Sequence, residues 1–288
     1  MDSLPAKFGH AVIGQLRRQK MKPLLKVSGL WTTLATNLYS TRREFGVIIN
    51  IIDNKKCCCY LKDRKRQKHS VSTFNRRSDR LTYILLDCAI YSEHLLTVDH
   101  LQNTVLPFLL SSAAQCTIYN CSHICTSVET FKFVFSQCEE YPSFRQLFIH
   151  NQGEESCEFI RKQIDFGSVK DLDLSSSTWP EDFSDSLKTF MNSPFVGHVL
   201  IQESNLKLDF DLVALFFKRW YDDSFNRIYG KTLLRGNLNF PLSVFEDLYP
   251  ENREDSELLI WYHKKVASKL TVTIEDNKKA DVSITVSF

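Results

Sequence analysis

The chain has 288 residues, of which 43% are hydrophobic and 24% are charged, so it can bury a sizeable core and is expected to form one or two domains. Its formal net charge of +2 is too close to neutral to imply a polyanionic partner for the whole protein, and no apolar run is long enough to predict a membrane-spanning helix. Lys7 interrupts the first apolar stretch, and basic residues follow it where a secretory signal would have small residues. We therefore expect an intracellular protein, cytoplasmic or nuclear, whose nine cysteines are mostly reduced thiols.

The N-terminal 39 residues carry an apolar pattern with helical spacing. Pro5 suits the first turn of a helix, because its missing N–H would be unpaired there, and an apolar stripe follows it to about Arg18. The pattern predicts a second short helix over 22–26 and a third over 27–39. Three short helices bury little surface alone, so apolar side chains left exposed would invite a partner.

This pattern resembles the F-box, a small helical module. The F-box motif has Leu-Pro, an apolar pair, a Leu, an apolar pair flanking a loop, Val-Cys/Ser, and Trp followed by Leu-Ala. The departures are Lys7, where the family usually has an acid, and Gly29-Leu30, where it usually has basic residues. The matching residues fall in register without a gap, and they are Leu4, Pro5, Val12, Ile13, Leu16, Met21, Leu24, Val27, Ser28, Trp31, Leu34 and Ala35.

The F-box resemblance implies that residues 1–42 bind a Skp-type adaptor and, through it, a cullin. The implied adaptor-binding residues are Leu4, Pro5, Val12, Ile13, Leu16, Met21, Leu24, Val27 and Trp31. The alternative is an ordinary helical hairpin that packs on the rest of the chain.

Residues 43–80 are expected to hold one strand, over 45–52, followed by a basic linker. The basic residues of segment 55–80 are opposed only by Asp63 and Asp79, so nuclear import or a nucleic-acid contact is an alternative. Nucleic acid is the less favoured partner, because the segment has only Tyr60 and Phe74 as aromatic side chains for base stacking. The Cys57–Cys59 triplet is interpreted as the end of a strand in which alternation would bury only one or two thiols.

From about residue 80, short apolar runs typical of strands alternate with amphipathic helical stretches and recur about every 25 to 33 residues. Strands are predicted over 81–90, 116–121, 145–150, 169–174, 197–202 and 229–234. Helices are predicted over 98–114, 127–141, 154–164, 181–192 and 210–222. Strands that alternate with helices indicate parallel pairing, since a helix returns the chain to the same edge of a sheet.

Region 81–288 is therefore expected to form an α/β fold, an irregular βα solenoid in which each unit buries its apolar face against its neighbours. The segment 169–174 resembles the Leu-x-Leu strand of leucine-rich repeats, although the usual Asn is absent in most units. A doubly wound sheet is the alternative, but it would need helices on both faces. Alternating residues over 258–263, 269–275 and 281–288 predict a C-terminal antiparallel hairpin that caps the solenoid edge.

The whole layout also resembles the divergent F-box families that are expanded in nematodes. Phe210 to Trp220 looks like the Phe-x(6)-Phe-x-x-Trp portion of their C-terminal region. The resemblance implies the substrate-recognition subunit of a Skp/cullin/F-box ubiquitin ligase that holds an unidentified protein cargo on the solenoid. A binding scaffold without an adaptor, or a nucleic-acid-associated protein that uses segment 55–80, are the alternatives.

Catalytic motifs are not found: the sequence has no G-x-S-x-G elbow, no phosphate-binding loop and no H-E-x-x-H zinc helix. Cys116, Cys121, His123 and Cys125 have a C-x4-C-x-H-x-C spacing that differs from the usual zinc knuckle, so buried free thiols are favoured. The remaining histidines are isolated in sequence and are not interpreted as catalytic bases; they include His10, His150, His198 and His263. We expect no enzyme activity, no cofactor and no metal.

Strand alternation also predicts where a cargo would bind. If Leu147/Ile149, Leu172/Leu174 and Val199/Ile201 point into the core, the intervening residues form a continuous surface on the opposite face. A shift of one residue in register would exchange the two sets. The predicted cargo-binding residues are Phe148, His150, Asp173, Ser175, Leu200 and Gln202.

Overall fold

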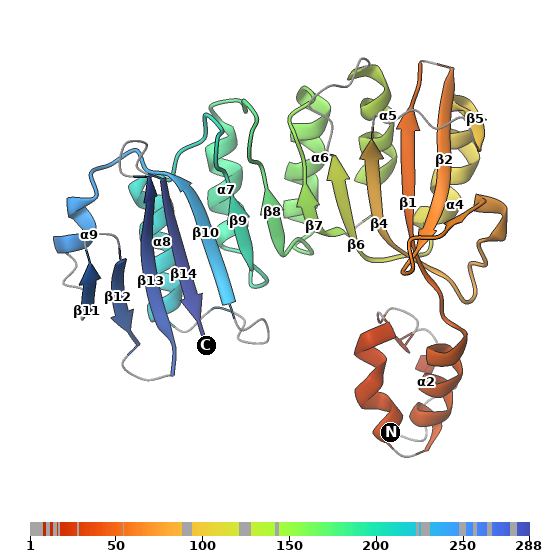
Figure 1. The fold of residues 1–288 in the computed structure, drawn as a ribbon, viewed down its shortest axis with the longest axis horizontal. Coiled ribbons are helices and arrows are strands. Elements are labelled where there is room, and N and C mark those ends of the chain that lie inside the picture. Colours follow the sequence, from red (N-terminus) through yellow and green to blue (C-terminus); the bar gives the residue numbers. More distant parts are fainter. Residues whose placement is uncertain are drawn as a thin grey trace. The chain divides into compact units, whose positions relative to one another are not determined.

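A computed structural model describes residues 8–9, 12–13, 16, 18–27, 29–53, 55–87, 94–120, 128–141, 144–222, 225, 231–247, 252–255, 258–263, 267–276 and 281–288 (Figure 1). The chain divides into two compact units, Met1–Phe144 and Arg145–Phe288. None of the described helices is long and apolar enough to cross a membrane.

The first unit begins with a helical cluster. Residues 8–9 and 12–13 are helical, and they are followed by the 3-10 helix η1 (Arg18–Lys26) and the α-helix α2 (Leu30–Thr41). The helix predicted over 27–39 begins later because Gly29 at its N-cap has a φ of 78°, a left-handed conformation that does not continue a helix. The helix expected over 22–26 is longer, starting at Arg18. Leu4 and Pro5 lie outside the described residues.

A sheet follows the helical cluster in the first unit, in the order β6-β4-β1-β2-β3, with β5 also pairing with β2. The pairs β1/β4 and β4/β6 are parallel, and the pairs β1/β2 and β2/β3 are antiparallel. The strands are β1 (Glu44–Ile51), β2 (Lys56–Asp63), β3 (Lys68–His69), β4 (Arg80–Asp87), β5 (Leu95–Thr97) and β6 (Ala113–Asn120).

The segment expected to be a basic linker therefore contains two strands of this sheet and the short 3-10 helix η2 (Val71–Thr73), which corrects the linker interpretation. The sequence interpretation missed β2 because charged residues flank its apolar centre. The residues of that centre, Cys57 to Leu61, are all buried. The expectation that alternation would bury only one or two of the three cysteines is wrong, because both faces of β2 are covered.

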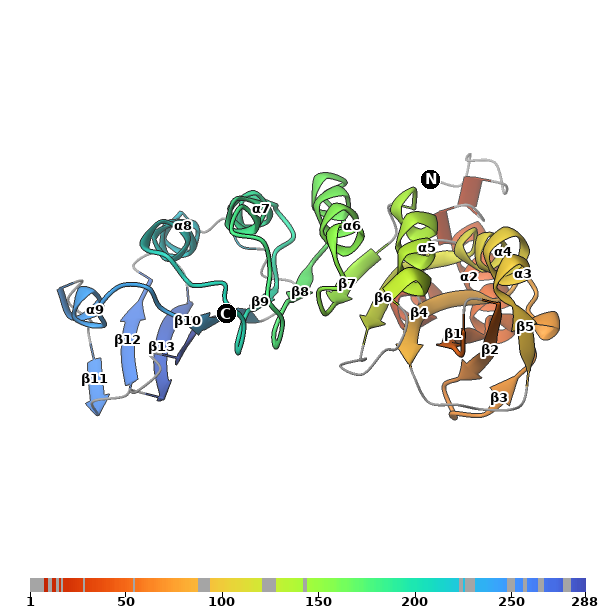
Figure 2. The same cartoon turned by 90° about the horizontal axis from the view of Figure 1, so that it is seen from above.

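Helices of the first unit lie on one face of its sheet, as Figure 2 shows for α3, α4 and α5. The helix predicted over 98–114 ends sooner because β6 starts at Ala113, and it includes a π-helical turn. The helical elements are α3 (Val98–His100), the π-helix η3 (Leu101–Val105), α4 (Leu106–Leu110) and α5 (Val128–Glu139).

The other face of the first sheet is closed by its own side chains. Ile48, Cys58 and Tyr60 are buried there, and Tyr83 and Leu85 pack against them. A Cβ atom on Gly46 would collide with the Tyr83 ring, so only glycine fits at this position of β1. We call these five packed residues the closed face.

The second unit contains a mixed sheet in the order β7-β8-β9-β10-β14-β13-β12-β11. Strands β7 to β10 run parallel, as predicted, and the remaining pairs are antiparallel. The strands are β7 (Phe144–Phe148), β8 (Asp171–Asp173), β9 (His198–Leu200), β10 (Lys231–Asn237), β11 (Asn252–Asp255), β12 (Leu258–Tyr262), β13 (Lys269–Asp276) and β14 (Asp281–Ser287).

The helices α6, α7 and α8 lie side by side on one face of that sheet (Figure 2). The doubly wound alternative needs helices on both faces, so these three helices do not match it. The predicted C-terminal hairpin is confirmed as β13/β14, and β14 extends the parallel strands by pairing with β10. The helices are α6 (Glu154–Asp165), α7 (Phe183–Met191), α8 (Phe210–Tyr221) and the short α9 (Ser243–Asp247).

Two asparagines connect consecutive βα units. Asn205, after β9, accepts the backbone N–H of Trp179 at 2.7 Å and donates to its carbonyl at 2.8 Å. Asn151, after β7, donates to the carbonyl of Thr178 at 2.6 Å. These side chains satisfy backbone groups in the neighbouring connection, so they hold successive units in register.

Candidate protein-binding surfaces

The helical cluster has a small core of its own. Ile13 and Met21 are fully buried together with residues of α2, and Leu16, Leu24 and Trp31 pack partly buried against them. The buried members from α2 are Leu34, Ala35 and Leu38.

Arg42, directly after α2, makes hydrogen bonds to two other parts of the helical cluster. It is only 2% exposed, and its Nη1 donates to the carbonyl of Ile13 at 3.4 Å and to that of Leu16. Burial, aided by the charge of Arg80, lowers the pKa of Arg42 to about 10. The guanidinium therefore connects the backbone at Ile13 and Leu16 to the end of α2 through hydrogen bonds.

Among the described residues of the cluster, three large apolar side chains face solvent. Phe8 is 49% exposed, Val12 is 40% exposed and Val27 is 46% exposed. Of the predicted adaptor-binding residues, the structure thus places two in the core and two at the surface, with the others half-buried or outside the described residues. An exposed set of this kind above a small core is what an apolar interface requires.

The face of the second sheet on which none of the described helices lies is a second candidate surface. The predicted inward residues Leu147, Leu172 and Val199 are buried and aligned across β7, β8 and β9, so the predicted register is confirmed. The next residue of each strand points to the opposite face. The row on that face runs through Phe148, Asp173, Leu200, Arg235, Ser283 and Thr273, and a second row runs through Gln146, Asp171, His198, Leu233, Thr285 and Thr271. We call these two rows the open face.

The six predicted cargo-binding residues are all half-buried, less exposed than a lone solvent-facing strand would leave them, because side chains of adjacent strands shield one another. Asp173 accepts the backbone N–H of Ser175 at 3.0 Å, and Gln202 donates to Asp281 of β14 at 2.6 Å. His150 lies 3.2 Å from the hydroxyl of Ser177. Phe148, Asp173 and Leu200 share one row of the open face, whereas His150, Ser175 and Gln202 follow the strand ends.

A charged cluster on the open face was missed by the sequence interpretation. Asp171, with a side chain only 5% exposed, accepts from Gln146 Nε2 at 2.6 Å, from the His198 backbone at 3.0 Å and from its ring Nδ1 at 2.9 Å. Burial acts to raise the pKa of Asp171, but these hydrogen bonds and the Lys170 ammonium outweigh it and hold the pKa below its ordinary value. The same alternation, carried two residues back from Asp173, would have placed Asp171 on this face.

The chemistry of this cluster suits recognition. A carboxylate that is saturated by hydrogen bonds fixes the His198 imidazole and leaves its other ring nitrogen for a partner. Within the part of the chain that the structure describes, no group of three or more His, Cys, Asp or Glu could hold a metal ion. Cys116 is buried and forms no disulfide, and Cys121, His123 and Cys125 lie outside the described residues.

Basic residues of segment 55–80 make several contacts within the first unit. Arg64 pairs with Glu44, and the Lys68 ammonium lies 5.2 Å from the ring centroid of Tyr60. Arg76 lies 5.6 Å from the ring centroid of Phe108. These contacts use charges that a nucleic-acid surface would direct outward.

The Phe-x(6)-Phe-x-x-Trp segment lies on α8. Trp220 is buried, whereas Phe210 is 54% exposed beside an aromatic pocket of about 160 Å³. The Phe217 ring lies 5.3 Å from that of Trp261 in an edge-to-face arrangement. The motif therefore joins α8 to β12 of the antiparallel cap through aromatic packing.

The sequence matches no model of a known protein family, and no curated protein matches it either. The F-box interpretation consequently depends on the residue pattern and on the placement of the side chains described above.

Proposed function

We propose that this chain is the substrate-recognition subunit of a Skp/cullin/F-box ubiquitin ligase. The helical cluster would bind the adaptor, and the open face, part of a βα solenoid, would bind a protein cargo. The single observation that carries the proposal is the exposure of Phe8, Val12 and Val27 above a core formed by Ile13 and Met21. Cytoplasm or nucleus is the expected compartment.

The exposed apolar side chains of the helical cluster support binding to an apolar partner, because the cluster is small. A cluster of fewer than about 45 residues buries little surface on its own, so exposing large side chains costs stability unless a partner covers them. Two of the three positions, Val12 and Val27, are also positions at which the F-box pattern has apolar residues. Both considerations support adaptor binding over an inert N-terminal hairpin.

The open face supports cargo binding through its hydrogen-bonding groups. Its rows alternate hydroxyl, carboxylate and guanidinium side chains with the apolar Phe148, Leu200 and Leu233. A half-buried apolar centre with polar neighbours is typical of protein interfaces. The Asn151 and Asn205 contacts between consecutive units support the solenoid interpretation, because they fix these rows in one register.

The test of adaptor binding is capture of the full-length chain on an immobilised, purified Skp-type adaptor. Val12→Asp together with Val27→Asp places charge on the exposed set, and we expect affinity to fall about 700-fold, since central apolar anchors contribute about 2 kcal/mol each. The matched control is Thr33→Asp with Asn37→Asp, two exposed polar positions of α2. Leu4→Ala with Pro5→Ala should also weaken capture.

Equal capture of all these variants would remove the F-box proposal and favour a scaffold without an adaptor. The nucleic-acid alternative has a different signature, because phosphate contacts make affinity fall steeply with added salt. Binding of DNA or RNA with that salt dependence, lost on charge reversal at Lys65, would support it instead.

A further inference from the structure

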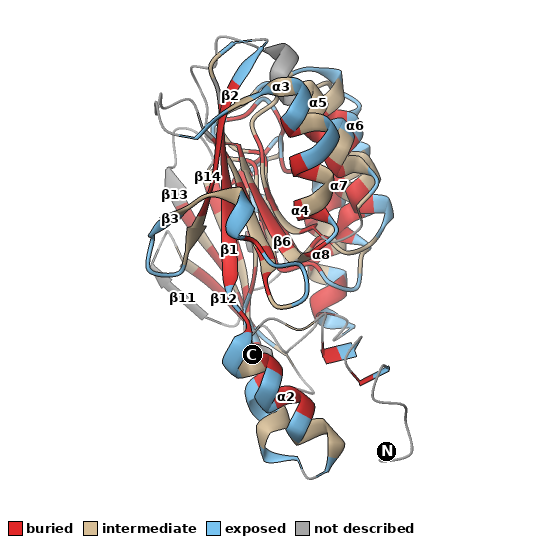
Figure 3. Ribbon diagram, turned by 90° about the vertical axis from the view of Figure 1, so that its right-hand side faces the viewer, coloured by how far each residue is buried: buried red, intermediate tan, exposed pale blue. Residues whose placement is uncertain are grey.

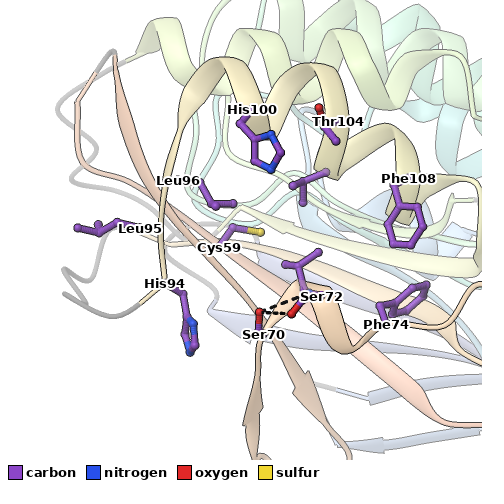
Figure 4. A pocket seen from close by; sticks show the side chains of 12 residues that line it. Cys59, Ser70, Ser72, Phe74, His94, Leu95, Leu96, His100, Thr104 and Phe108 are labelled. Atoms are coloured by element: carbon purple, nitrogen blue, oxygen red, sulfur yellow. Dashed lines mark hydrogen bonds between the residues drawn. The ribbon is translucent and has the colours of Figure 1, made fainter.

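A pocket of about 500 Å³ lies in the first unit between β2, η2 and segment 94–108, which contains the strand β5 and the helical elements α3, η3 and the start of α4 (Figure 4). This volume is within the range of small-molecule sites, about 300 to 1,000 Å³. It is formed by described residues and is separate from both candidate protein-binding surfaces. Nothing in the proposed adaptor or cargo binding uses it.

The interior of the pocket is apolar. Val71 and Val105 line it, and Figure 4 shows Phe74 and Phe108 at one end, with ring centroids 5.9 Å apart in an edge-to-face arrangement. Cys59 contributes its sulfur, which points inward in Figure 4. Burial raises the pKa of the Cys59 thiol, so the sulfur stays protonated and uncharged. The interior therefore suits a ring or a branched hydrocarbon.

Polar groups border this apolar interior. Figure 4 shows the His100 ring directed into the pocket from α3. The hydroxyls of Ser70 and Ser72 lie opposite and are 2.9 Å apart, so one of them donates to the other and the pair still has a proton to donate outward. An oxygen-bearing head group would find hydrogen-bond donors on both sides.

The charge around the pocket favours an anionic head group. Its described lining residues include His94 and His100 but no Asp or Glu. The Arg76 guanidinium lies 5.6 Å from the Phe108 ring centroid, at the aromatic end. A buried cation would thus lack a partner, whereas a carboxylate would accept from imidazole and hydroxyl donors.

We propose that this pocket binds a small carboxylic acid with an aromatic or branched apolar body. The body would occupy the space between Val71, Val105 and the Phe74–Phe108 pair, and the carboxylate would lie at His100 and Ser72. The proposal is independent of adaptor and cargo binding.

The probe is anilinonaphthalene sulfonate, an aromatic anion whose fluorescence rises in apolar sites, titrated into the full-length chain. Phenylpropanoate, phenylpropanol and phenylpropylamine, which share a body and differ in the head group, then compete with it. We expect the acid to displace the probe at a concentration about tenfold lower than the amine, with the alcohol between them.

Val71→Trp should fill the pocket and abolish competition by the acid. Val98→Trp is the matched control, at a nearby half-buried valine that does not line the pocket. A probe that binds the Val71→Trp variant with wild-type affinity, and is still displaced by the acid, would overturn the site assignment.

His100→Leu tests the head group at an exposed position, where folding is not at risk. We expect the preference for acid over alcohol to be lost, so that the two compete at about equal concentration, while the alcohol competes as before. An unchanged preference, or an amine that competes as well as the acid in the wild type, would overturn the proposed ligand class.

Discussion

The two sheets of this protein differ in how far side chains are buried on the face that none of the described helices covers. In the first unit, β1 is buried along nearly its whole length, as Figure 3 shows, and the closed face is sealed by Tyr60, Tyr83 and neighbouring aliphatic side chains. In the second unit, β14 alternates between half-buried and buried residues along its whole length, and β10 does so after the exposed Lys231. A strand that is buried on both faces has no surface left for a partner, whereas an alternating strand keeps one.

The difference explains why the two units would have different roles. The closed face gains stability from the packing of Ile48, Cys58 and Tyr60, and only Tyr83 and Leu85 of its five residues are half-buried. The open face carries several hydroxyls and the His198 imidazole, which the buried Asp171 carboxylate holds in place, at positions that a partner can reach. The difference predicts that substitutions on the closed face and at the buried Asp171 change stability, while those at the half-buried side chains of the open face change binding.

Gly46→Val should have the largest effect on stability. Its side chain would collide with the Tyr83 ring, and overpacking of this kind costs about 3 kcal/mol of unfolding free energy. Ser283→Val, on the open face, is the control and should cost under about 0.5 kcal/mol. Denaturant unfolding measures both variants.

A double-mutant cycle sharpens this test. In a Tyr83→Ala background the collision partner is absent, so Gly46→Val should then cost less than half of its original penalty. Equal penalties in the two backgrounds would mean that Tyr83 does not close this face.

Asp171→Asn should have the next largest effect, about 2 kcal/mol at pH 7, because a buried carboxylate loses its charge-assisted hydrogen bonds to Gln146 and His198. The pKa of Asp171 is lower in the folded protein, so its stabilisation is complete above the unfolded pKa and is lost as pH falls below about 4. Chemical unfolding at pH 7 and at pH 3 should show the difference from wild type shrinking. A difference that stays constant over this range would contradict the assignment.

Asn205→Ala should cost about 1 to 2 kcal/mol, since it removes both hydrogen bonds to the backbone of Trp179. The control is Asn192→Ala, an exposed asparagine whose side chain donates to Lys188 one turn earlier in the chain. If both variants lose the same stability, Asn205 does not connect the units.

Asp173→Lys should have the smallest effect, about 0.5 kcal/mol, because this half-buried carboxylate accepts only the local N–H of Ser175 among the described contacts. Combined with Phe148→Ala, it should abolish cargo binding while adaptor capture remains. A large loss of melting temperature would place Asp173 in the core and move the cargo surface elsewhere.

Much of the second unit could be predicted from the sequence, because helices and strands there follow clear periodicities. The register of Leu147, Leu172 and Val199 was predictable for the same reason, as each strand alternates cleanly. The Asn205 contact was not predictable, because it joins residues 26 positions apart through a loop that has no periodic signal.

The first unit was harder to predict. The strands β2 and β3 lie among charged residues, and the run of lysines and arginines suggested a solvated linker. The long lysine and arginine side chains near the strand ends form ion pairs such as Arg64–Glu44. Only the tertiary structure brings these two residues together. The pairing of Asp171 with His198 likewise depends on parallel strands that are 27 residues apart in the chain.

Calorimetric titration of the purified adaptor into the 288-residue chain tests most directly our proposal that the helical cluster binds a Skp-type adaptor. The account predicts saturable one-to-one binding with a negative heat-capacity change, because the exposed apolar side chains Phe8, Val12 and Val27 become buried. No binding heat at any of several temperatures, under conditions in which the chain is folded, would contradict it.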